Sequence, residues 1–142
     1  MRCAALTTAL VVTLALAGCA GGTSNEDSSS DIKGEQEAVA SEIEYLQSAA
    51  EDSDERGICG DILTGELRDA ITAKGGAATC RGALEKALKD TDQSDLTVKT
   101  VTIDGDQATA VVRAKLSDDR YRPDLTVGLR KRGAAWRISK LP

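Results

Sequence analysis

The sequence predicts an α+β domain, in which three N-terminal helices pack on one face of a four-stranded antiparallel sheet. Two observations carry this prediction. Apolar residues recur at helical spacing up to about residue 89, and from Leu96 onward they recur at every second position, as in half-buried strands. The period changes once, so the helices precede the strands. Strands that follow one another through short turns form an antiparallel meander, with the helices on one sheet face.

The first helix is expected from Ile32 to about Asp54. Ser30 or Asp31 can cap its start, because their side chains accept hydrogen bonds from the first backbone N–H groups. Gly57 is expected to follow its end as a C-cap. One helix face carries the apolar stripe Val39, Ile43, Leu46 and Ala50.

A second helix is expected from about Ile58 to Thr72, and a third over Cys80 to Lys89 with Thr79 as its N-cap. Gly60 and Gly65 weaken the second helix, by about 1 kcal/mol each if both are interior. The second helix is expected to bury Ile58, Ile62, Leu67 and Ile71, and the third to bury Leu84, Ala87 and Leu88.

The first strand begins at Leu96 and changes phase near Lys99-Thr100, which predicts a β-bulge there. Asp104-Gly105 predicts a hairpin turn. Three further strands are expected over residues 107–117, 124–131 and 134–141. Their inward side chains are expected to be Ala108, Ala110, Val112, Ala114 and Leu116, then Leu125, Val127 and Leu129, then Trp136 and Ile138.

The N-terminal segment has the pattern of an export signal. Met1-Arg2 gives a positive start, and Ala4 to Ala17 is uncharged but shorter than the roughly 20 residues that span a bilayer. Leu16-Ala17-Gly18-Cys19 resembles the lipobox of bacterial lipoproteins. That resemblance implies cleavage before Cys19, a diacylglyceryl group on its sulfur, and a protein anchored to the cell membrane on its extracytoplasmic side. The alternative is a plain secreted protein in which Cys19 is incidental.

These observations divide the chain into three parts. Residues 1–18 are expected to be a lipoprotein signal peptide, and residues 19–31 the lipidated cysteine with a flexible tether, because the tether is small and polar. Residues 32–142 form the folded domain. The first half of the domain is acidic and the second half is basic, within a chain of formal net charge −5.

Three stretches of the domain resemble the nuclear-transport-factor-2-like, cystatin-like superfold, and more narrowly the small actinobacterial lipoproteins with that fold. The stretches are Ile58-Cys59-Gly60-Asp61-Ile62-Leu63-Thr64, Thr79-Cys80-Arg81-Gly82-Ala83-Leu84, and Ile103 to Val111 with Gly133 to Ile138. The likeness covers about Ile32 to Leu141. It implies a curved sheet that wraps the first helix. The superfold includes enzymes, ligand-binding proteins and scaffolds, so it assigns no function.

Cys59 and Cys80 are expected to form a disulfide. Cys3 lies in the signal and Cys19 is expected to carry lipid, so two of the four cysteines remain. The compartment beyond a signal sequence usually permits oxidation. The alternative is a pair of free, buried thiols.

Four basic side chains alternate with the apolar residues of the strands and are therefore expected on the outer sheet face. They are Arg113, Lys115, Arg130 and Arg137. They form either a solvated surface or a contact face for an anionic partner, such as lipid headgroups, a wall polymer or an acidic protein. Nucleic acid is not expected as a partner of an acidic chain outside the cell.

The composition gives no sign of catalysis. The chain has no histidine, which is the commonest general base and a frequent metal ligand, and no nucleophile–base pair is evident. We therefore expect no cofactor and no metal site. The predicted function is a non-catalytic, lipid-anchored binding or scaffold module, held to the membrane by Cys19, with a membrane or cell-wall protein or an anionic polymer as its partner. The alternative is a small-ligand carrier or enzyme that uses the concave face of the sheet.

Overall fold

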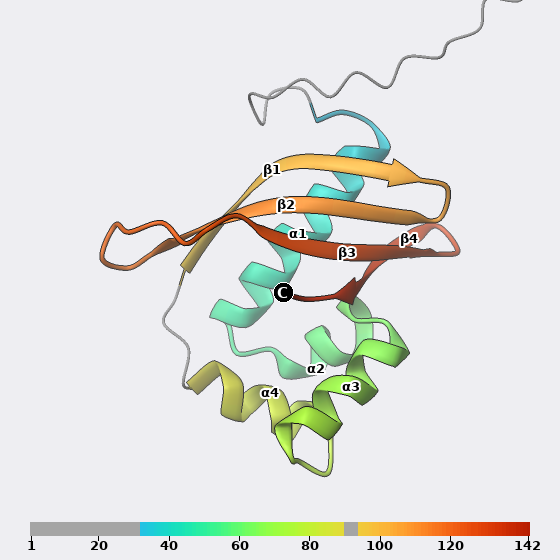
Figure 1. Ribbon diagram of the computed structural model, residues 1–142. Coiled ribbons are helices and arrows are strands. Elements are labelled where there is room, and N and C mark those ends of the chain that lie inside the picture. The colour runs from blue at the N-terminus through green and yellow to red at the C-terminus, as the bar shows by residue number, and fades with distance from the viewer. Residues whose placement is uncertain (1–31, 90–93) are drawn as a thin grey trace, which may run out of the picture.

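The computed structural model describes residues 32–89 and 94–142. It confirms the α+β class: helices occupy the first half, and a four-stranded antiparallel sheet in the order β1-β2-β3-β4 follows. Figure 1 shows α1 lying against the sheet, with α2, α3 and α4 gathered at one end. Cys19 and both predicted N-terminal segments, 1–18 and 19–31, lie outside the described residues.

Helix α1 spans Glu35–Glu51, which is shorter than the expected range. Its N-cap is Gly34, with φ of 62°, a conformation that glycine adopts without steric cost. The expected caps Ser30 and Asp31 lie outside the described part of the chain. Val39 and Ile43 of α1 are almost completely buried, so the predicted apolar stripe does face the core.

The prediction of one helix from Ile58 to Thr72 is wrong. The chain instead forms a short helix α2 (Glu55–Gly57), a π-helical turn η2 (Ile58–Ile62) and a separate helix α3 (Gly65–Gly75). Thr64 begins α3, because its Oγ1 accepts a hydrogen bond from Leu67 N–H at 3.3 Å. Gly65 is therefore the first residue of α3 and does not weaken a helix interior.

Gly57 is also not the predicted C-cap of the first helix. It has helical torsions and leads directly into η2. The Asp54 carboxylate accepts a hydrogen bond from Gly57 N–H at 3.0 Å and so caps α2. A Cβ at position 57 would lie 2.3 Å from Asp54 Oδ2, so any larger residue here would displace the capping carboxylate.

Helix α4 spans Cys80–Lys89, and Thr79 caps it as predicted, since its Oγ1 accepts from Gly82 N–H at 3.2 Å. Its buried residue is Ala83, on which α3 packs closely at Gly75: a Cβ there would lie 2.7 Å from that of Ala83. The helix was expected to bury Leu84, Ala87 and Leu88. This prediction is wrong in part, because Leu84 and Leu88 are half-buried and Ala87 is exposed.

The sheet follows the sequence prediction closely. Its strands are β1 (Ser94–Asp104), β2 (Gln107–Leu116), β3 (Leu125–Arg132) and β4 (Ala135–Lys140). The register of β1 against β2 shifts between Val98 and Thr100, which confirms the predicted bulge. Gly105 and Gly133 form the two tight turns at φ of 60° and 64°.

The core lies between α1, η2 and the inner face of the sheet. The core side chains that come from β2 are small, and they let α1 approach the sheet closely. Buried members from the strands are Val98, Val101, Ala108, Ala110, Val112, Val127, Leu129, Trp136 and Ile138. Across residues 32–89 and 94–142, no helix combines the length and the apolar character needed to cross a bilayer.

Candidate functional site

The predicted disulfide is present. Cys59 of η2 and Cys80, the first residue of α4, are bonded, with their Cα atoms 6.2 Å apart. Cys59 is almost completely buried. The bond ties η2, which packs on the core, to α4, whose own buried surface is small. The disulfide therefore holds the outer helices to the rest of the domain.

The four predicted basic residues do not form a uniform cationic surface. Arg113 Nε lies 2.9 Å from Asp124 Oδ1, and Lys115 Nζ lies 2.6 Å from Asp119 Oδ1. These hydrogen bonds hold the pKa values of the two aspartates below their ordinary range. The Arg113 guanidinium also lies 5.9 Å from the centre of the Tyr121 ring. Both cations are therefore partly neutralised by acids of the β2–β3 connection.

The remaining two basic residues pair across β3 and β4, where Arg130 lies opposite Arg137. The Arg137 guanidinium donates a hydrogen bond to the Gly60 carbonyl of η2 at 2.8 Å. Arg130 is exposed. The pKa of Glu66 is lowered first by the Glu66 backbone N–H, then by Arg132 and the Thr64 hydroxyl, and least by Arg130. Three of the four side chains thus have partners within the chain, and contact with an anionic partner stays a prediction.

A half-buried carboxylate lies next to Arg137. Burial raises the pKa of Glu42 in α1, the positive charge of Arg137 acts against that rise, and the negative charge of Asp61 in η2 adds to it. The junction of α1, η2 and β4 therefore holds two acids and one guanidinium. Among the described residues no group of three acids, cysteines or histidines is placed to hold a metal ion.

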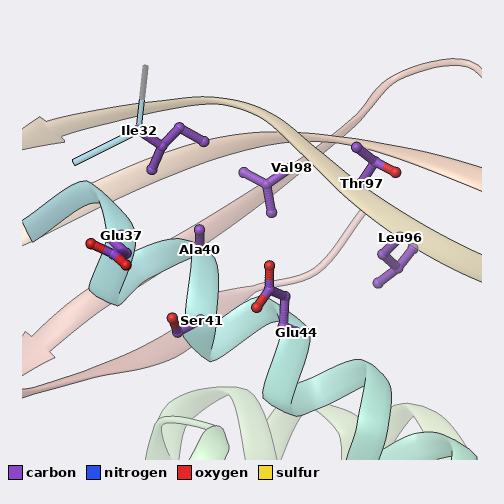
Figure 2. Close-up of a pocket in the computed structure, with 8 residues that line it drawn as sticks. All are labelled: Ile32, Glu37, Ala40, Ser41, Glu44, Leu96, Thr97 and Val98. Atoms are coloured by element: carbon purple, nitrogen blue, oxygen red, sulfur yellow. The ribbon is translucent and has the colours of Figure 1, made fainter. Parts of the chain in front are cut away.

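A cavity of about 490 Å³ opens between α1 and β1 (Figure 2). Helix α1 contributes one stripe of side chains to it, and β1 contributes three consecutive residues. We call this cavity the α1–β1 groove. It is lined by Ile32, Glu37, Ala40, Ser41, Glu44, Leu96, Thr97 and Val98.

Two glutamines of α1 fix the position of the helix against β1. Gln36 Nε2 donates to the Val101 carbonyl, and Gln47 Oε1 accepts from Leu96 N–H, both at 2.8 Å. They lie eleven residues apart on the helix, before Glu37 and after Glu44. The stretch of α1 that lines the groove is therefore held at both of its ends.

Sequence reasoning did not find this groove. The spacing of Glu37, Ser41 and Glu44 places them on one helix face, which was the available signal. The sequence does not show which strand forms the edge of the sheet beside that face, so it does not predict the groove.

Neither a protein-family model nor a curated protein matches this chain. Solved structures do match it. A protein named Rd1NTF2_05, in a variant form, has a TM-score of 0.50 at 17% identity, covering 75% of this chain and 96% of its own. The fold is NTF2-like. At this level of identity the likeness shows the fold alone.

Two further structures are similar to a slightly lower degree. One is a Campylobacter jejuni protein provisionally named an NTF2-like transpeptidase, with 15% identity, TM-score 0.47, and coverage of 76% of this chain and 99% of its own. The other is a de novo designed NTF2-fold protein, with 13% identity, TM-score 0.49, and coverage of 73% and 83%. The NTF2-like fold includes both ligand-binding proteins and enzymes, so function has to be argued from the site.

Proposed function

We propose that this protein is a lipid-anchored, extracytoplasmic binding module without catalytic activity. The distribution of its cysteines carries the proposal. Cys19 follows an apolar run and a set of small residues that resemble a lipobox, whereas Cys59 and Cys80 are joined. A stable disulfide is typical of compartments outside the cytoplasm. In this proposal the chain is one of the small actinobacterial lipoproteins of the NTF2-like fold.

The α1–β1 groove supports a binding role. Its volume lies within the range of about 300 to 1,000 Å³ that is common for ligand sites. The inner sheet face, by contrast, is filled by buried apolar side chains packed against α1, such as Ala110 and Val112. We therefore place the ligand in the groove at the sheet edge and not on the concave face.

The lipid on Cys19 would hold this module at the membrane surface. Stable anchoring by acyl chains takes two hydrophobic chains, which a diacylglyceryl group supplies. Twelve residues, 20–31, separate Cys19 from the domain. A membrane protein, a wall protein or an anionic polymer would lie within reach of the domain.

The anchor is tested by replacing the lipid-bearing cysteine. We expect Cys19→Ala to abolish incorporation of a labelled fatty acid and to remove the processed protein from the membrane fraction. Cys3→Ala is the matched control, because it also removes one cysteine of the N-terminal segment and should leave labelling unchanged. A Cys19→Ala protein that still carries the label in membranes would contradict the proposal.

A further inference from the structure

We propose that the α1–β1 groove binds an extended, basic peptide segment of a partner protein, which pairs with the edge strand β1. This inference rests on the proposed function as a binding module and specifies the chemistry of its partner.

The groove lies along the edge of β1. Successive side chains of a strand point to opposite faces of a sheet, so a pocket on one face contacts every second residue. Leu96, Thr97 and Val98 are consecutive, and all three line the groove. A cavity that meets three residues in a row runs beside the strand, where the strand backbone forms part of its wall. In the part of the chain that the structure describes, β1 is an edge of the sheet and pairs with β2 alone.

The backbone of β1 has polar groups that face away from β2. In an antiparallel pair, alternate residues direct their N–H and C=O groups toward the partner strand and away from it. Leu96 N–H bonds the side chain of Gln47, and the Val101 carbonyl bonds that of Gln36, so both point outward. The Leu96 carbonyl shares the direction of its N–H. The Leu96 N–H and the Val101 carbonyl are already bonded to α1, so an added strand would pair with the outward groups that lie between them, of which the Leu96 carbonyl is one.

The charge of the groove selects a cationic occupant. Glu37 and Glu44 lie seven residues apart on α1, about 10.5 Å along the helix axis, with Ser41 between them. No basic residue lines the groove, and within the described ranges neither glutamate forms an ion pair. Ile32 and Leu96 supply apolar surface along which the stems of lysine or arginine side chains can lie.

Lys33 and Lys99 are single basic residues beside the groove-lining Ile32 and Val98, whereas the longer segments that adjoin the groove are acidic. Residues 20–31 and residues 90–93 contain five acids and no basic residue. The acids concerned are Glu26, Asp27 and Asp31, and Asp90 and Asp92. Segments of this composition do not supply a cationic occupant, so we assign the occupant to another molecule.

The test uses the full chain, purified in detergent, and the acetylated, amidated peptide Lys-Val-Lys-Val-Lys with a fluorescent label. Alternation places its three lysines on one side, about 6.6 Å apart, so that the outer two bracket the glutamate pair. We expect saturable binding that weakens with salt. Glu37→Gln/Glu44→Gln should reduce the affinity about tenfold or more, because both charges that face the peptide are lost.

Asp69→Asn/Glu85→Gln is the matched control, because it removes two exposed acids of α3 and α4 and changes the net charge equally. Its affinity should equal that of the unmodified chain. A second probe leaves the protein unchanged: the same peptide with N-methylated backbone amides keeps its charges but cannot pair with β1, and we expect about tenfold weaker binding.

Three results would overturn the inference. They are no binding of the peptide, equal loss of affinity in both double variants, and equal affinity of the N-methylated peptide. A linear polyamine that competes as well as the peptide would also overturn it, by showing a site for small cations. Each result leaves fatty-acid labelling of Cys19 unaffected, so failure of this inference is separable from failure of the proposed function.

Discussion

Leu63 forms a parallel bridge with Ile138 of β4, and the next residue, Thr64, donates its N–H to the Ile138 carbonyl at 2.8 Å. The segment between η2 and α3 thus extends the sheet beyond its last strand. Leu63 is 2% exposed and Ile138 is completely buried, so this contact is also part of the core. The contact between Leu63 and Ile138 therefore fixes the position at which α3 begins.

We predict that Leu63→Ala lowers the free energy of unfolding by about 2–5 kcal/mol, because it leaves a cavity beside Ile138. Leu84→Ala in α4 is the control, because it makes the same substitution at a half-buried position. Its loss of unfolding free energy should be clearly smaller. Urea unfolding of both variants measures the difference. Equal losses would mean that Leu63 is not a core residue.

The sheet could be predicted from the sequence because its signals are local. Alternating residues, the Asp104-Gly105 turn and the phase slip near Lys99 each depend on a few neighbouring positions. The break at Leu63 depends on a contact with Ile138, far along the chain, and the apolar spacing alone therefore favoured one continuous helix.

The groove was missed for the same reason. Whether Glu44 faces solvent or a cavity depends on which strand lies beside α1. The two bonds that place β1 there, from Gln36 and to Gln47, join residues more than 45 positions apart. Local sequence patterns predict where helices and strands lie and which of their faces is apolar. They do not predict which helix lies beside which strand.

The disulfide should contribute substantially to stability. Its chain separation is 21 residues, for which loop-closure entropy gives roughly 3 kcal/mol. We expect Cys59→Ser/Cys80→Ser to lower the melting temperature, and a reductant to lower that of the unmodified chain but not of the variant. Alkylation of both cysteines without reductant, followed by mass spectrometry, would reveal free thiols and contradict the bond.

Gly57 and Gly60 should respond in opposite ways to alanine. A Cβ at position 57 meets the Asp54 carboxylate, so Gly57→Ala should destabilise the domain by about 1–3 kcal/mol. A Cβ at position 60 has nothing within 4 Å, and Gly60→Ala should be neutral or stabilising by up to about 1 kcal/mol. Thermal unfolding compares the two variants, and a larger loss at position 60 would refute the assignment of the Asp54 cap.

Glu42 should make stability depend on pH. Burial raises its pKa in the folded state, so folding favours the protonated form. The folded state therefore loses stability as the pH rises from the ordinary carboxyl pKa of 4.5 through the raised value. We predict that Glu42→Gln is more stable than the unmodified chain at pH 7 and that the difference shrinks below pH 4.5. A difference that is constant across this range would contradict the assignment.

The central claim is that Cys19 carries a lipid that anchors the binding module to the membrane. Intact mass spectrometry of the chain extracted from membranes of its host, with a digest of its N-terminal peptide, tests this most directly. The account predicts a mature chain that begins at Cys19 and carries a diacylglyceryl group on its sulfur. A chain that retains residues 1–18, or one that begins near Cys19 with an unmodified thiol, would contradict it.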